Sequence, residues 1–150
     1  MSRTIVITRP KAAAERFADA LAGQIGNAKI VIAPVLEIRF QGGLPDLAEV
    51  EALIFTSQNG VEAFARLSER RDLPCFCVGA KTAELAQLLG MTVLAHEPDA
   101  ARFVPALQAL ESKLQTLHIR GVHARGGIAG RLSASGQPTR KKVLYDQVGV

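Results

Sequence analysis

Short apolar runs rich in β-branched residues alternate with segments of helical periodicity along almost the whole chain. At residues 52–55, for example, the run Ala-Leu-Ile-Phe is followed closely by a helical pattern over 60–67. This alternation predicts an α/β fold with a parallel sheet covered on both faces, because each crossover helix returns the chain in the same direction. Ligands of such proteins bind beyond the carboxyl ends of the strands. The pattern predicts strands at 5–7, 29–33, 52–55, 74–78, 92–95, 116–119 and 142–145, and helices at 11–21, 47–50, 60–67, 82–89, 100–114 and 128–134.

Two segments have the composition of connectors. Residues 34–45 are extended and end in a Gly-Gly-Leu-Pro break, and a second connector follows Pro138. If both join the same two bodies, residues 1–33 begin a first α/β domain and residues 46–140 form a second domain inserted into it, with linkers at 34–45 and 141–150. The first domain would then hold two strands and one helix, too little for an independently stable sheet. We therefore expect an incomplete first domain, which an exchange of strands between two copies into a homodimer would complete.

Composition and charge argue against several classes of protein. No apolar run approaches the ~20 residues of a membrane span, and the N-terminal run is too short for a secretory signal, so we expect a cytoplasmic protein without a membrane partner. The net charge of +4 would suit nucleic acid, but aromatics make up only 5% of the residues, Trp is absent and no basic helix occurs. A small polyanion fits the charge at least as well, and we expect no nucleic-acid partner.

The segment Thr56-Ser57-Gln58-Asn59-Gly60 lies where a predicted strand turns into a helix. Free backbone N–H groups and the positive end of a helix suit a phosphate or carboxylate there. Ser, Thr and Asn are also ordinary helix caps, so the alternative is an N-cap alone. Similar junctions occur at residues 78–83 and, more loosely, at Thr8-Arg9-Pro10 and Arg120-Gly121, and none of them has the P-loop or dinucleotide-binding spacing.

Three other features have both a chemical and a structural interpretation. The single tyrosine, Tyr145, could donate a proton to a departing hydroxyl, or could close the end of a core strand. The basic residues concentrated between His118 and Lys142 fit either a solvated face or a polyanion site, and His118 itself is predicted to be structural. The only cysteines, Cys75 and Cys77, share one side of a strand and are predicted to be buried core thiols, because no further ligands indicate a metal.

With these pieces in order, the chain resembles the uroporphyrinogen-III synthase family. The resemblance rests on the order and spacing of several short strand–helix junctions rather than on any single motif. The matching segments are Ile7-Thr8-Arg9-Pro10, Ile54-Phe55-Thr56-Ser57-Gln58-Asn59-Gly60-Val61, Val78-Gly79-Ala80-Lys81-Thr82-Ala83 and Ile119-Arg120-Gly121, followed by Arg125, Leu132, Gly136 and Val143-Leu144-Tyr145.

The resemblance implies a flavodoxin-like, two-domain architecture in which the second domain is inserted into the first. It also implies a lyase that closes the linear tetrapyrrole hydroxymethylbilane into uroporphyrinogen III, inverting the last pyrrole ring and losing water, without metal or organic cofactor. By position, Tyr145 matches the tyrosine proposed to assist departure of the hydroxyl. The residues that the resemblance places at the substrate are Thr8, Arg9, Ser57, Asn59, Gly79, Thr82 and Arg120.

The chain departs from the resemblance in two ways. Family members are longer and continue past the tyrosine to complete the first domain, and the basic residue that usually follows the tyrosine is Asp146 here. We therefore expect a truncated synthase. Two alternatives are a non-catalytic α/β module that binds a small anion and an inactive fragment that associates with a partner chain.

Overall fold

The structure is a computed structural model that describes residues 3–24, 26, 28–123 and 127–150. These residues form two compact units. The smaller unit is drawn from residues 1–39 and 147–150, and the larger unit comprises Phe40–Asp146. The larger unit is thus inserted between the two parts of the smaller one. The predicted α/β class, with parallel strands and an inserted second unit, is confirmed.

The described part of the smaller unit contains its own pair of parallel strands and one helix, and its residues 36–39 and 147–149 belong to two strands of the second sheet. Strand β1 (Thr4–Ile7) pairs with β2 (Lys29–Ile32), and helix α1 (Lys11–Ala22) connects them. Ile7 and Ala14 are buried, whereas Val6 on β1 is 56% exposed and Ile32 on β2 is 36% exposed. The described residues of this unit therefore bury few apolar side chains.

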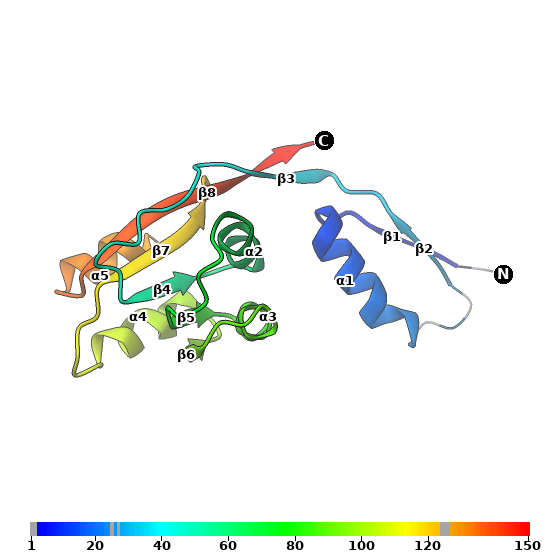
Figure 1. Cartoon of the computed structure of the whole chain (residues 1–150). Helices are drawn as coiled ribbons and strands as arrows, with labels where there is room; N and C mark the ends of the chain where they lie inside the picture. Colours follow the sequence, from blue (N-terminus) through cyan, green and yellow to red (C-terminus); the bar gives the residue numbers. More distant parts are fainter. Residues whose placement is uncertain (1–2, 25, 27, 124–126) are drawn as a thin grey trace. The chain divides into compact units, whose positions relative to one another are not determined.

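The larger unit is built on a sheet with the strand order β3-β8-β7-β4-β5-β6 (Figure 1). The pairs β8–β7, β7–β4, β4–β5 and β5–β6 are all parallel. The strands of this sheet are β3 (Leu36–Phe40), β4 (Ala52–Phe55), β5 (Cys75–Val78), β6 (Val93–Glu97), β7 (Thr116–Gly121) and β8 (Thr139–Gly149). Residues 36–39 of β3 and 147–149 of β8 belong to the smaller unit. Its helices are α2 (Gln58–Leu67), α3 (Ala80–Leu88), α4 (Ala100–Gln108) and α5 (Ile128–Ala134).

Helices cover both faces of this sheet, as the continuous burial of β4 requires. On one face, Ala52 and Ile54 belong to a buried cluster with side chains of α4 and α5, including Phe103 and Leu132. Leu53 and Phe55 point to the other face, where the rings of Phe55 and Phe64 of α2 meet edge to face with centroids 5.9 Å apart. The carboxyl ends of β4, β5 and β7 therefore lie at one edge of a well-packed sheet.

Two predicted helices differ from the structure. The helix expected at 47–50 is a turn, because the Asp46 carboxylate accepts a hydrogen bond from the Ala48 N–H and closes an Asx turn instead of capping a helix. The helix expected at 100–114 ends at Gln108. There the Leu110 N–H donates to the Leu107 carbonyl in a tightened last turn, and Lys113 Nζ caps the Gln108 carbonyl.

The segment predicted as a return linker is mostly a strand. Strand β8 runs from Thr139 to Gly149, far beyond the predicted strand at 142–145, because β7 offers a full ladder from Thr116↔Thr139 to Gly121↔Tyr145. Likewise, most of the first predicted linker's apolar part forms β3. Within the described residues, no helix is both long enough and apolar enough to cross a membrane.

Candidate active site

Tyr145 lies near the carboxyl end of β7, where the predicted junctions of the larger unit gather. Its side chain is only 8% exposed, and its hydroxyl lies 2.7 Å from Ser57 Oγ. The two residues are 88 positions apart in sequence and meet because β8 and β4 flank β7. A phenol held by a second hydroxyl can donate or accept a proton at this point.

Ser57 is the N-cap of α2. Its extended backbone and its side chain, which accepts a hydrogen bond from the Gly60 N–H at 3.2 Å, are those of a standard cap. Gly60 suits this position, because a Cβ on it would lie 3.1 Å from the Ile119 carbonyl oxygen of β7. Ser57 therefore serves both as a helix cap and as the partner of Tyr145.

Thr56 and His118 form a second polar pair one residue before this cap. His118 Nε2 lies 3.0 Å from Thr56 Oγ1, and the imidazole is 2% exposed. Burial, and then the positive charge of Arg120, lower the pKa of His118 from 6.5 to about 4. The imidazole is neutral near pH 7 and ties β7 to the end of β4. Sequence reasoning gave His118 a structural role but did not identify Thr56 as its partner.

Gly79 and Thr82 lie at the start of α3. Gly79 has a φ of 92°, which favours glycine, and its N–H donates to the Glu97 carbonyl at 2.7 Å. Thr82 is buried one turn into the helix. Gly79 therefore shapes the turn between β5 and α3 at the same sheet edge as Ser57.

Arg120 and Asn59 occupy the same edge of the larger unit. The Arg120 guanidinium donates to the Gly121 carbonyl at 3.1 Å and to the Val122 carbonyl at 3.3 Å, so it braces the segment that follows β7. Asn59 lies half-buried in the first turn of α2. Arg125, part of the matching pattern, falls outside the described residues.

Thr8 and Arg9 belong to the smaller unit. The Thr8 carbonyl accepts a hydrogen bond from the Val35 N–H at 3.1 Å, and the Arg9 guanidinium lies 4.5 Å from the centroid of the Phe17 ring. Both follow β1, at the carboxyl end of that strand. Their predicted part in substrate binding stays a prediction.

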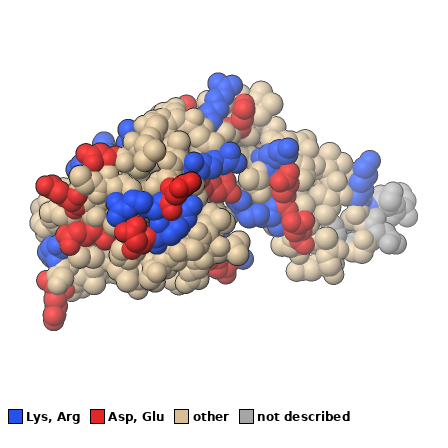
Figure 2. All heavy atoms as spheres, viewed as in Figure 1, with Lys and Arg blue, Asp and Glu red and all other residues tan. Residues whose placement is uncertain are grey.

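The basic residues between His118 and Lys142, which the sequence groups together, make several separate contacts in the structure. His118 is buried, Arg120 binds backbone carbonyls, and Arg140 reaches the Ala48 carbonyl at 3.4 Å. His123 Nε2 lies 3.4 Å from Asp146 Oδ1, a pair that becomes ionic when the imidazole is protonated. Figure 2 shows Lys and Arg interspersed with Asp and Glu over the face in view.

Cys75 and Cys77 are free, buried thiols on the face of β5 opposite Phe76. Their sulfurs lie 3.9 Å apart. The contact with Cys75 and burial both raise the pKa of the Cys77 thiol above its usual range. Among the residues that the structure describes, no group of three His, Cys, Asp or Glu side chains is placed to hold a metal ion.

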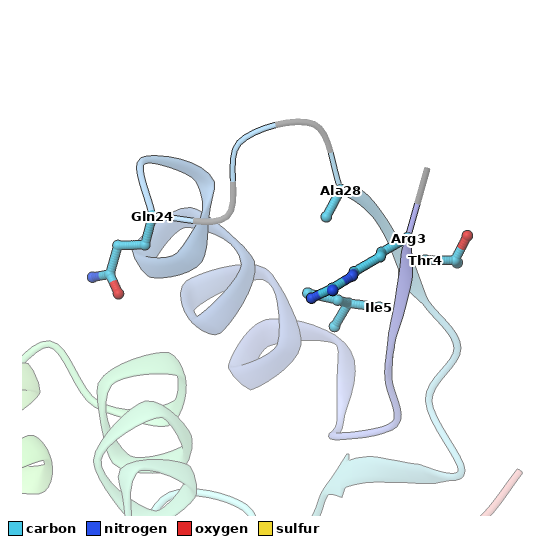
Figure 3. A pocket seen from close by; sticks show the side chains of 5 residues that line it. All are labelled: Arg3, Thr4, Ile5, Gln24 and Ala28. Carbon is cyan, nitrogen blue, oxygen red and sulfur yellow. The ribbon is translucent and has the colours of Figure 1, made fainter. Parts of the chain in front are cut away.

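A cavity of about 680 Å³ in the smaller unit lies away from the carboxyl ends of its strands. Its lining includes Arg3, Thr4 and Ala28, which are at or just before the starts of β1 and β2. In Figure 3 the side chains of Arg3 and Ile5 point toward α1, whereas that of Thr4 points away. Because ligands of parallel sheets bind at the opposite strand ends, this cavity is not the candidate active site.

The fold and the geometry at this edge define a class of protein. They describe a parallel α/β protein that presents a paired tyrosine and serine, together with two helix N-termini, at the carboxyl ends of its strands. The chain belongs to the uroporphyrinogen-III synthase family, because the family model described as uroporphyrinogen-III synthase HemD matches residues 15–149.

Solved structures support the fold assignment. The chain is similar to the uroporphyrinogen-III synthetase of Helicobacter pylori, with a TM-score of 0.67 and 18% identity, over 100% of this chain and 63% of the other. A mutant uroporphyrinogen III synthase of the extremely thermophilic bacterium Thermus thermophilus gives a TM-score of 0.61 and 15% identity, over 100% of this chain and 64% of the other. This chain therefore spans less than two thirds of the length of these structural relatives. No curated protein matches the sequence.

Proposed function

We propose that this chain is a uroporphyrinogen-III synthase that cyclises hydroxymethylbilane, with inversion of the last pyrrole ring and loss of water, in tetrapyrrole (heme) biosynthesis. Membership of the family over residues 15–149 is the observation that carries this proposal. Tyr145, almost fully buried at the carboxyl end of the sheet and hydrogen-bonded to Ser57, supports it at the level of chemistry.

In the proposed reaction, the bond between the terminal methylene carbon and its hydroxyl breaks. Tyr145 gives its phenol proton to the departing hydroxyl, which leaves as water, and the substituted α-carbon of the last pyrrole bonds to the resulting methylene cation. The bond from that α-carbon to its original methylene then breaks, and this methylene bonds to the free α-carbon of the same ring, so that the ring is inverted. The proton displaced from pyrrole restores the phenol. Since the substrate supplies both nucleophile and leaving group, the protein mainly orients one flexible molecule and shields its cation from water.

The substrate is a polycarboxylate, which fits the helix N-termini of α2 and α3. Backbone N–H groups and the positive helix ends favour carboxylates, and a guanidinium can bind them in bidentate fashion. On this proposal, Ser57, Asn59, Gly79, Thr82 and Arg120 border the carboxylates on the larger unit. Thr8 and Arg9 do so on the smaller unit. No cofactor takes part in the proposed reaction.

A second candidate function is binding of an acidic tetrapyrrole without turnover. The observation that favours it is length, because the chain covers 63% of the Helicobacter pylori structure.

One assay separates the two functions. The purified chain is mixed with hydroxymethylbilane, and the type I and type III isomers are separated. A type III product above the spontaneous type I background supports the synthase. Changing Tyr145→Phe removes only the hydroxyl and is expected to lower the type III rate about a hundredfold. Type I product alone, together with tight binding of uroporphyrinogen, would favour the binding module.

A further inference from the structure

A register change in β8 sets the position of Tyr145. Strands β7 and β8 pair residue by residue up to Arg120↔Val143, but the next residue of β7, Gly121, pairs with Tyr145 instead of Leu144. One extra residue in a strand changes the side of the sheet to which the following side chains point. The irregularity therefore places Tyr145 opposite Gly121, on the side where α2 begins.

Gly121 leaves room for the ring in that position. A Cβ added to Gly121 would lie 2.5 Å from Tyr145 Cε2 and 2.7 Å from Cζ, so any other residue would displace the ring. The Val122 N–H donates to the Tyr145 carbonyl at 3.0 Å and fixes the backbone at the same place. The ring and the backbone of Tyr145 are thus both held, and Ser57 holds the hydroxyl.

The hydrogen bonds at Ser57 have a preferred direction. Ser57 Oγ already accepts from the Gly60 N–H, at the positive end of a ten-residue helix. A hydroxyl that accepts a hydrogen bond becomes a better donor, because successive hydrogen bonds polarise one another. The favoured chain runs from the Gly60 N–H to Ser57 Oγ, and from the Ser57 hydroxyl to Tyr145 Oη.

We propose that Ser57 is a positioning residue that donates its hydroxyl hydrogen to Tyr145 Oη and leaves the phenol proton available to a ligand. This inference rests on the proposed function for its purpose, and it changes the role of Ser57 from substrate contact to orienter of the acid. The positive end of α2 then influences the acidity of Tyr145 through the hydrogen bonds from the Gly60 N–H to Ser57 and from Ser57 to Tyr145.

The chain offers a spectroscopic test that does not depend on catalysis. It contains one tyrosine and no tryptophan, so the ultraviolet resonance Raman bands of phenol report Tyr145 alone. The phenol C–O stretching band distinguishes an oxygen that accepts a hydrogen bond from a phenol that donates its proton to a protein oxygen. We expect the acceptor signature in the unchanged protein.

Two substitutions of Ser57 separate capping from donation. Ser57→Thr keeps the hydroxyl and should keep the acceptor signature. Ser57→Asp still caps α2, because a carboxylate accepts from the Gly60 N–H, but it cannot donate, so Tyr145 should change to a donor. Ser68→Ala is the matched control at the other end of α2, where Ser68 Oγ accepts from the Arg70 N–H, and it should leave the tyrosine bands unchanged.

The result that overturns the inference is a donor signature in the unchanged protein. The wild-type spectrum decides this even if a variant fails to fold. Activity is a separate measurement. If the unchanged chain forms type III product, Ser57→Asp should lower its rate about tenfold further than Ser57→Thr does, with Ser68→Ala near normal. If it forms none, the proposed function fails while the Raman bands still decide the role of Ser57.

Discussion

At the scale of single residues, the buried His118 makes the stability of the folded protein depend on pH. Its pKa is lowered to about 4 in the folded chain from an ordinary value of 6.5, first by burial and then by Arg120. Both states are neutral at His118 above pH 6.5. Between pH 6.5 and about 4 the unfolded chain binds a proton that the folded chain does not, so stability falls as pH falls through this window.

We therefore expect wild-type protein to lose roughly 3 kcal/mol of unfolding free energy from this residue across that window. His118→Gln removes the titrating group and keeps a side chain that can bond Thr56, so its stability should vary less with pH. His96→Gln, at an exposed position, is the matched control. Urea unfolding at several pH values measures the slope. An equal slope in His118→Gln and wild type would contradict the assignment.

The residues of the site differ in how far sequence predicts them. Ser57 could be predicted as a cap, because strand, cap and helix are consecutive in the chain. Its contact with Tyr145 could not, since it depends on sheet order and on the extra residue Leu144. The fit of Gly121 to the tyrosine ring depends on the same irregularity. Distances across a sheet follow from register, and no local pattern encodes that register.

At the scale of elements, local patterns predicted the existence of most strands and helices better than their ends. The strand at Ala52–Phe55 and the helix at Ile128–Ala134 have the predicted bounds. The predictions of a helix at 47–50 and of a late end to α4 were wrong, because side-chain hydrogen bonds to nearby backbone groups outcompeted a helix there. Strand β8 was underpredicted because its partner strands define its length, and its own residues are largely polar.

Strand β5 yields a prediction about thiol chemistry. Cys75 and Cys77 are both fully buried, so a reagent in solution cannot reach either sulfur. Their contact lowers the pKa of Cys75 and raises that of Cys77, so burial protects Cys75, and burial together with its raised pKa protects Cys77. Both thiols of the native chain should react slowly with a disulfide reagent such as dithionitrobenzoate. In denaturant both should react at once, giving two equivalents per chain. Rapid labelling of the native protein would show that β5 is accessible in solution.

At the scale of the whole molecule, the two units should differ in stability. Every residue of β4 is buried, whereas the described part of the smaller unit has a two-stranded sheet and leaves Val6 largely exposed. Amides of β1 and β2 should therefore exchange with deuterium faster than those of β4, β5 and β7. Hydrogen exchange followed by mass spectrometry measures this, and equal protection in the two units would contradict it.

Pairing between copies remains a prediction at this scale. Both strands of the smaller sheet are edges, and exposed apolar edges attract further strands. If copies exchange or add strands there, light scattering should give twice the 16.0 kDa of one chain. Val6→Lys should then shift the protein to monomer. Leu94→Lys, at a 51% exposed position on the edge strand β6 of the larger sheet, should not. A monomer at all concentrations would exclude the homodimer.

The two ends of the larger unit lie close together, which makes the unit suitable for insertion into another protein. It begins at Phe40 and ends at Asp146, and its first and last strands are neighbours, with the Gln41 N–H bonded to the Leu144 carbonyl at 2.8 Å. Closing a host loop across such neighbouring ends costs little entropy. Residues 40–146 could therefore be inserted as a domain into a surface loop of another protein. The inserted domain would include the Ser57–Tyr145 pair.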